Sequence, residues 1–96
     1  IQAVDVRYMM QRWKVDSSMI LAVNYDTNQE CMELELHSGA VWRFRHVPAI
    51  LIEDMLKAES KGKFYNLWVK DLFEKEVVRD HGGRLVYAER AMAMAS

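Results

Sequence analysis

The chain has 96 residues, a length that fits one domain with its own hydrophobic core and excludes an array of several full-size domains. Hydrophobic residues make up 51% of the chain and charged residues 28%, which excludes an intrinsically disordered polar chain. The formal net charge of −1 excludes a uniformly basic nucleic-acid binder, so any contact with nucleic acid has to rest on a local basic patch.

Cysteine content and hydropathy bear on the environment of the protein. The single cysteine, Cys31, has no partner for an internal disulfide, which favours a reducing compartment such as the cytoplasm. No apolar run approaches the ~20 residues of a membrane-spanning helix, and no signal peptide is recognisable, so we expect no membrane partner. Because the chain begins at Ile1 and not at Met, we expect it to be trimmed or to be part of a longer protein.

The first 14 residues give two competing patterns. Val4, Val6 and Tyr8 alternate with other residue types, as in a strand, whereas residues 9–13 fit the start of a helix equally well.

Three stretches between residues 19 and 47 then alternate apolar and more polar side chains, which is the period of half-buried strands. Turn-forming residues separate them, so we predict an antiparallel meander of three or more strands. The apolar series are Met19-Leu21-Val23-Tyr25, Met32-Leu34-Leu36 and Trp42-Phe44-His46.

Side-chain parity also predicts how the strands pair, because a shift of one residue moves every side chain to the opposite face. In the first hairpin it gives Asn28-Gln29 as a two-residue turn. In the second, a three-residue loop over residues 38–40 keeps apolar residues together and opposes acidic to basic side chains. The predicted pairs are Leu21–Leu36, Val23–Leu34 and Tyr25–Met32, then Leu36–Trp42, Leu34–Phe44, Glu35–Arg43 and Glu33–Arg45.

Two helices are predicted after the strands. Pro48 suits the first turn of a helix, where its missing N–H removes no hydrogen bond. We expect Ser60 and Gly62 to end this helix, with Gly62 as a left-handed cap, and the second helix to begin near Lys63. The apolar positions at helical spacing are Leu51, Ile52, Met55 and Leu56, then Tyr65, Trp68, Val69, Leu72 and Phe73.

The organisation of the whole chain follows from these elements. Residues 79–83 indicate a break, and residues 85–94 a short helix or a loose tail. We predict a single α+β domain over residues 1–96, a small antiparallel meander followed by two α-helices packed on one face of the sheet. Its core spans residues 15–78, with an N-terminal extension of residues 1–14 and a C-terminal extension of residues 79–96 that we expect to be flexible.

Short motifs follow one another between Val15 and Phe73. They are Val15-Asp16-Ser17-Ser18, Tyr25-Asp26, Gly39, Trp42-x-Phe44, Val47-Pro48 and the run from Ala58 through Gly62 to Asn66. In this order they resemble the KTSC domain, a bacterial and phage module named after the C-terminus of some lysyl-tRNA synthetases. The family's central Tyr-x-Tyr is Trp42-Arg43-Phe44 in this chain, so both phenol hydroxyls are missing. The resemblance implies no established activity, and RNA binding as a suggestion from the synthetase context.

Lys61-Gly62-Lys63 at the start of the second helix is the strongest candidate binding site. Helix N-terminal amides with lysines beside them attract anions, and Ser60 and Asn66 add donors. The alternative is an ordinary helix cap and a solvated turn. The predicted nucleic-acid contacts are Lys61, Lys63, Lys70, Arg43, Arg45 and Asn66, with Tyr65 or Phe64 as a stacking ring.

Several of these residues also have a structural interpretation. Trp42 and Phe44 would stack bases on an open face, but their parity places them under the helices, and we expect them in the core. We expect Arg43 and Arg45 to pair with the glutamates opposite them. The same structural interpretation applies to Ser17, Ser18, Tyr25, Pro48 and Gly62.

No constellation for catalysis is recognisable in the sequence. Ser17 and Ser18 follow Asp16 without a histidine nearby in the chain, so turn chemistry explains them. Side chains two apart on a strand are separated by about 7 Å, too far for one tetrahedral metal site. This argues against a metal at the row Cys31-Glu33-Glu35-His37. We expect no enzyme activity, no metal and no cofactor.

The leading functional hypothesis is a non-catalytic module that binds RNA through a local basic patch. The alternative is a protein-interaction module that binds a partner or forms a homodimer, because the chain carries seven methionines, an adaptable residue type. Four of these lie in the terminal segments, namely Met9, Met10, Met92 and Met94.

Overall fold

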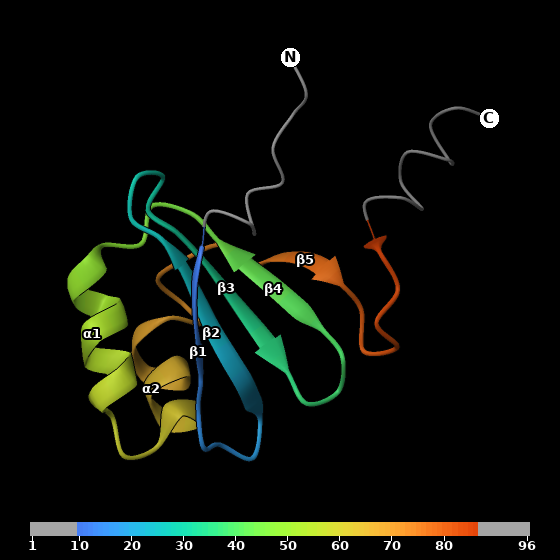
Figure 1. Ribbon diagram of the computed structural model, residues 1–96, viewed down its shortest axis with the longest axis horizontal. Helices are drawn as coiled ribbons and strands as arrows, with labels where there is room; N and C mark the ends of the chain where they lie inside the picture. Colours follow the sequence, from blue (N-terminus) through green and yellow to red (C-terminus); the bar gives the residue numbers. More distant parts are fainter. Residues whose placement is uncertain (1–9, 87–96) are drawn as a thin grey trace.

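The computed structural model describes residues 10–86, which form one five-stranded antiparallel sheet and two helices (Figure 1). The strands lie in the order β1-β2-β3-β4-β5, so each strand pairs with its neighbour in the chain. The predicted α+β class, with both helices on one face of the sheet, is confirmed. The elements are β1 (Gln11–Lys14), β2 (Ile20–Asp26), β3 (Cys31–Leu36), β4 (Val41–Phe44), α1 (Ala49–Lys57), α2 (Lys61–Trp68) and β5 (Glu76–Arg79).

The hydrophobic core lies between the sheet and the two helices. Alternate strand residues enter it, as their parity predicts, except at the start of β2, where Ile20 and not Leu21 is a core residue; each helix contributes residues at helical spacing. The principal members are Val23, Tyr25, Met32, Leu34 and Phe44 from the strands and Ile52, Met55, Tyr65 and Val69 from the helical region.

The first hairpin keeps most of the predicted register but has a longer turn. Val23 opposes Leu34 as predicted, whereas a bulge near Ala22 places Ile20, and not Leu21, opposite Leu36. The predicted two-residue turn is wrong: strand pairing ends at Asp26 and Cys31, and residues 27–30 form the loop. One carboxylate oxygen of Asp26 accepts hydrogen bonds from the amides of Asn28 and Gln29, and Glu30 has a left-handed backbone with φ of 51°, so Thr27 and Glu30 do not extend the ladder.

The second hairpin has a three-residue loop, as predicted, but the loop is residues 37–39. The Leu36 amide donates to the Ala40 carbonyl at 2.9 Å and closes it. The last residue of such a loop adopts a left-handed conformation, and Gly39, with φ of 98°, fills that position. The predicted register is therefore wrong by two residues, which preserves the faces but changes every partner. The observed pairs are Met32–Phe44, Glu33–Arg43, Leu34–Trp42 and Glu35–Val41.

The helices begin close to the predicted residues and end earlier. Pro48 is the residue before α1, and Lys57 is the last residue of α1. Gly62 is not a left-handed cap: it lies in the first turn of α2, and Ser60 caps that helix by accepting from the Lys63 amide. Within the described part of the chain, neither helix is long and apolar enough to cross a lipid bilayer.

Two short strands complete the sheet at its edges. Residues 11–14, for which the sequence left strand and helix open, form β1 and pair with β2. The break predicted from Arg79 begins one residue later, because Arg79 is the last residue of β5 and pairs with Val41. The alternation at residues 4–8 and most of the predicted element at 85–94 lie outside the described residues.

Candidate functional site

The Trp42-x-Phe44 motif faces the helices, as its parity predicts. Phe44 is fully buried, and the ring of Tyr65 from α2 packs against both motif rings, at centroid distances of 5.6 Å to Trp42 and 6.1 Å to Phe44. Tyr65 is therefore buried, and its ring has no face for a nucleobase. The ammonium of Lys75 lies 4.3 Å from the Trp42 centroid, a cation–π contact at the rim of the core.

The motif residues before the first helix make structural hydrogen bonds. The Tyr25 hydroxyl donates to the Val47 carbonyl, the residue before Pro48, at 2.6 Å. Burial, and to a lesser extent nearby negative charge, raises the pKa of Tyr25. The Ser17 hydroxyl accepts from the amides that begin β2, whereas Ser18 is exposed. His37 contacts the Ser17 carbonyl and not its hydroxyl, so the two do not form a nucleophile and base.

The predicted pairing of the two arginines with acidic residues is confirmed in kind but not in partner. Nε and Nη2 of Arg43 both bind one oxygen of Glu33, at 2.8 and 2.7 Å. Burial acts to lower the pKa of Arg43, but the hydrogen bond and charge of Glu33 outweigh it and raise that pKa. Arg45 pairs with Glu76 of β5 at 3.4 Å, and Glu35 binds a residue of β1 in place of Arg43.

The predicted anion site at the start of α2 divides into two parts. The Lys61 ammonium donates to the carbonyls of Leu56 and Ala58, where it caps the end of α1. The Lys63 ammonium is exposed, and residues 10–86 place no acidic partner within ion-pair distance of it. Of the two lysines, only Lys63 therefore has its charge available for a ligand.

The outer side of α2 and the turn after it expose large apolar residues that sequence reasoning did not identify. Leu67 is 72% exposed, Trp68 54% and Leu72 63%. The stripe, meaning the apolar positions at helical spacing from Tyr65 to Phe73, gave Trp68 and Leu72 an inward position. However, α2 ends at Trp68. Helical spacing therefore does not continue, and only Val69 and Phe73 of the following turns pack inward. Leu67, an apolar residue outside the stripe, was the signal that could have indicated this surface.

A shallow cavity of about 550 Å³ adjoins these exposed residues. Its walls are the α1–α2 connection and one side of α2. The lining residues are Ala58, Glu59, Ser60, Lys63, Phe64, Leu67 and Trp68.

The strand row considered for a metal does not assemble a metal site. Across residues 10–86, no group of three or more histidine, cysteine or acidic side chains comes close enough to hold an ion. Cys31 is buried, which raises the pKa of its thiol. Its protonated form is a small packing group and not a reactive thiolate.

Comparisons with known proteins agree with the motifs. Residues 16–73 match the family model of the KTSC domain. A protein of Stutzerimonas stutzeri is 35% identical over 57 residues, which are 59% of this chain and 80% of that protein. A lysine–tRNA ligase of a Nostoc species is 30% identical over 63 residues, which are 66% of this chain and 11% of the ligase. A solved KTSC domain protein from Yersinia pestis matches with a TM-score of 0.69 at 29% identity, covering 72% of this chain and 97% of that one. The chain belongs to the KTSC domain family.

Proposed function

We propose that the domain is a small non-catalytic RNA-binding module, and that its contact surface is the outer side of α2 with the turn after it. The observation that carries the proposal is Trp68, whose side chain is 54% exposed. An exposed indole stacks on any nucleobase, at about 1–3 kcal/mol per base. Phe64 lines the same cavity, so a second ring lies close to the first.

The positive charge for such a contact comes from Lys63 and Lys70. Lys63 lines the cavity beside Trp68. Lys70 is exposed in the turn after α2, and Asn66 is exposed within α2. Two lysines contact few phosphates, which corresponds to weak binding that falls as salt rises. Four residues of the sequence-based surface are left out because their charge or ring is already engaged: Arg43, Arg45, Lys61 and Tyr65.

Similarity to the ligases supports an RNA partner and a cytoplasmic site of action. A lysine–tRNA ligase handles tRNA, and 63 residues of one resemble this chain. Because those residues make up 11% of the ligase, its aminoacylation reaction is not part of the proposal.

The second candidate function is binding of a protein partner at the same surface. Leu67 and Leu72 flank Trp68 and are more exposed than the indole itself. Clustered exposed aliphatic side chains are typical of protein interfaces, whose affinity depends little on salt. Salt dependence therefore separates the two candidates.

The test is a titration of short single-stranded RNA and of tRNA, followed by fluorescence anisotropy at about 50 and about 200 mM salt. We expect Trp68→Ala to weaken binding between about fivefold and about 150-fold, and Trp68→Phe to weaken it less. Lys63→Gln is expected to reduce the slope of log affinity against log salt by about one.

Matched controls carry the same changes elsewhere on the surface. Lys14→Gln removes an exposed lysine of β1, and Ile50→Ala removes an exposed apolar side chain of α1, so both should bind RNA like the unaltered protein. Absence of binding at low salt, or full binding by Trp68→Ala, contradicts the proposal. Lys61 is kept in every variant because its loss would disturb the end of α1.

A further inference from the structure

The face of the sheet that the helices leave uncovered, called the open face below, carries a row of charged and polar side chains. Strand register places five residues side by side across the sheet, one from each strand. In order they are Arg12, Asn24, Glu33, Arg43 and Glu76. The open face lies away from α2, so the inference below is independent of the proposed RNA contact.

Glu33 is the unusual member of this row. Its side chain is 1% exposed, and both bonding nitrogens of Arg43 converge on the same carboxylate oxygen, Oε2. The other oxygen, Oε1, is buried and receives no hydrogen bond from any donor within residues 10–86. Buried carboxylate oxygens are almost always satisfied by a donor, so Oε1 marks a place where a donor from outside the domain would fit.

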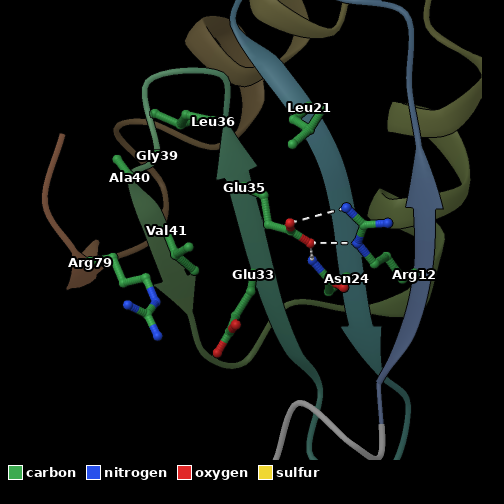
Figure 2. Close-up of a pocket in the computed structure, with 10 residues that line it drawn as sticks. All are labelled: Arg12, Leu21, Asn24, Glu33, Glu35, Leu36, Gly39, Ala40, Val41 and Arg79. Atoms are coloured by element: carbon green, nitrogen blue, oxygen red, sulfur yellow. Dashed lines mark hydrogen bonds and ion pairs between the residues drawn. The ribbon is translucent and has the colours of Figure 1, made fainter. Parts of the chain in front are cut away.

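The neighbouring glutamate of the same strand shows the satisfied arrangement. Glu35 accepts from Arg12 at 2.8 and 3.1 Å and from the amide of Asn24 at 2.8 Å, and Figure 2 shows all three side chains drawn together. Within residues 10–86, both carboxylate oxygens of Glu35 therefore accept hydrogen bonds, whereas only Oε2 of Glu33 does.

A cavity of about 390 Å³ lies over this part of the open face, within the size range of small-molecule sites. Glu33 and Glu35 line it from β3, and Arg79 lines it from β5 (Figure 2). Its apolar walls are aliphatic, formed by Leu21, Leu36, Ala40 and Val41.

Arg79 supplies the complementary charge. Its Nη1 donates to the Gly83 carbonyl at 2.8 Å, and it forms no ion pair within residues 10–86. In Figure 2 its guanidinium and the Glu33 carboxylate lie on the same side of the sheet with Val41 between them. Among residues 10–86, the cavity thus offers an acceptor without a donor and a cation without an anion, with aliphatic side chains beside them.

We propose that this cavity binds a small aliphatic zwitterion of amino-acid size, with its ammonium on Glu33 Oε1 and its carboxylate on Arg79. A free cation would leave the guanidinium unmatched, and a free anion would leave Glu33 Oε1 without a donor. A molecule with both charges satisfies both groups, and an aliphatic side chain fits the apolar wall.

The test uses L-leucine and two analogues that each lack one charge, 4-methylpentanoate and 3-methylbutylamine. Each is titrated into isotope-labelled protein while the backbone amide resonances of β3 and β5 are followed by NMR. We expect saturable shifts at Glu33 and Arg79 with L-leucine, and affinity at least about tenfold weaker for either analogue, because each leaves one charged group unmatched.

Two variants locate the binding. Arg79→Gln is expected to weaken L-leucine binding at least about tenfold, and Glu33→Gln to do the same. Glu33→Gln also breaks the pair with Arg43 and could unfold the sheet. If the Glu33→Gln protein loses its native NMR spectrum, the result for Arg79→Gln decides the test. Arg45→Gln, an exposed arginine outside the cavity, should bind unchanged. No saturable shift with L-leucine, equal binding of the amine alone, or full binding by Arg79→Gln overturns the proposal.

Discussion

The hydroxyl of Tyr25 fixes the chain just before α1. It donates to the Val47 carbonyl at 2.6 Å, and both residues are buried. Tyr25→Phe removes the one donor that residues 10–86 provide for this buried carbonyl. We therefore expect the free energy of unfolding to fall by about 1–3 kcal/mol, measured by urea denaturation. Tyr65→Phe is the matched control: its ring packs in the core, but its hydroxyl has no hydrogen bond within residues 10–86. An equal loss in both variants would contradict this role of the Tyr25 hydroxyl.

Burial of Cys31 makes a second residue-scale prediction, about alkaline pH. Because burial raises the pKa of its thiol, the folded protein holds this proton at pH values where the unfolded chain has lost it. The stabilisation is complete below the ordinary pKa of 9.0 and is lost as pH rises through the raised value. We expect unfolding free energy to fall more steeply between about pH 8 and about pH 10 in the native protein than in Cys31→Ala. Tyr65 contributes equally to both proteins, whereas the charge of Cys31 is one of the smaller causes of the raised pKa of Tyr25. The difference therefore reports the thiol together with its coupling to Tyr25.

The alternation of β3 and β4 could predict which of their residues face the core but not which residues pair across the strands. The parity of Trp42 and Phe44 placed both under the helices, because alternation is a local property of a strand. The partner of Arg43 depends on register, and register depends on which loop residue is left-handed. The role of Lys61 depends on where the last carbonyls of α1 lie, which no pattern in its own neighbourhood reveals.

The two central glycines, Gly39 and Gly62, exchange the roles that the sequence indicates for them. Gly39 has φ of 98°, whereas Gly62 is helical and a Cβ there would meet no atom within 4 Å. We expect Gly62→Ala to stabilise the protein by about 0.5–1 kcal/mol and Gly39→Ala to destabilise it by about 1–2 kcal/mol. Thermal unfolding of the two variants tests this. A stabilised Gly39→Ala would show that the hairpin does not need its left-handed residue.

Element boundaries were predictable where a side chain marks them and not where packing sets them. Pro48 lies immediately before α1 and marks its start, close to the first-turn position expected for it. Ser60 marks the start of α2 as its cap, although its sequence context predicts the end of the first helix. The end of α2 at Trp68 has no such marker, and the apolar spacing continues to Phe73. The exposed surface on which the RNA proposal rests was missed for this reason, since a longer helix would have buried part of it.

At the scale of the whole molecule, the sheet extends beyond the region that matches the family. The match covers residues 16–73, which excludes β1 and β5. Both are four-residue strands whose pattern is too short to be decisive on its own. Each becomes a strand by pairing with a longer neighbour, and such long-range pairing is invisible to local propensity.

Removing these edge strands provides the final prediction. A fragment of residues 16–73 loses two backbone ladders and the Arg12–Glu35 and Arg45–Glu76 ion pairs. At about 0.5–1.5 kcal/mol for each net hydrogen bond, we expect it to be less stable than a fragment of residues 10–86 by more than about 3 kcal/mol in urea denaturation. The bared edges of β2 and β4 should also cause concentration-dependent association.

Fragments that lack only one edge strand show whether the two losses are independent. β1 and β5 lie at opposite edges with three strands between them, so deleting each in turn should give losses that sum to the loss in the double deletion within about 0.5 kcal/mol. A 16–73 fragment as stable as the 10–86 fragment would mean that β1 and β5 do not contribute to the stability of the sheet. A double loss much larger than the sum would instead mean that the two edges support each other through the polar row of the open face, which joins Arg12 on β1 to Glu76 on β5.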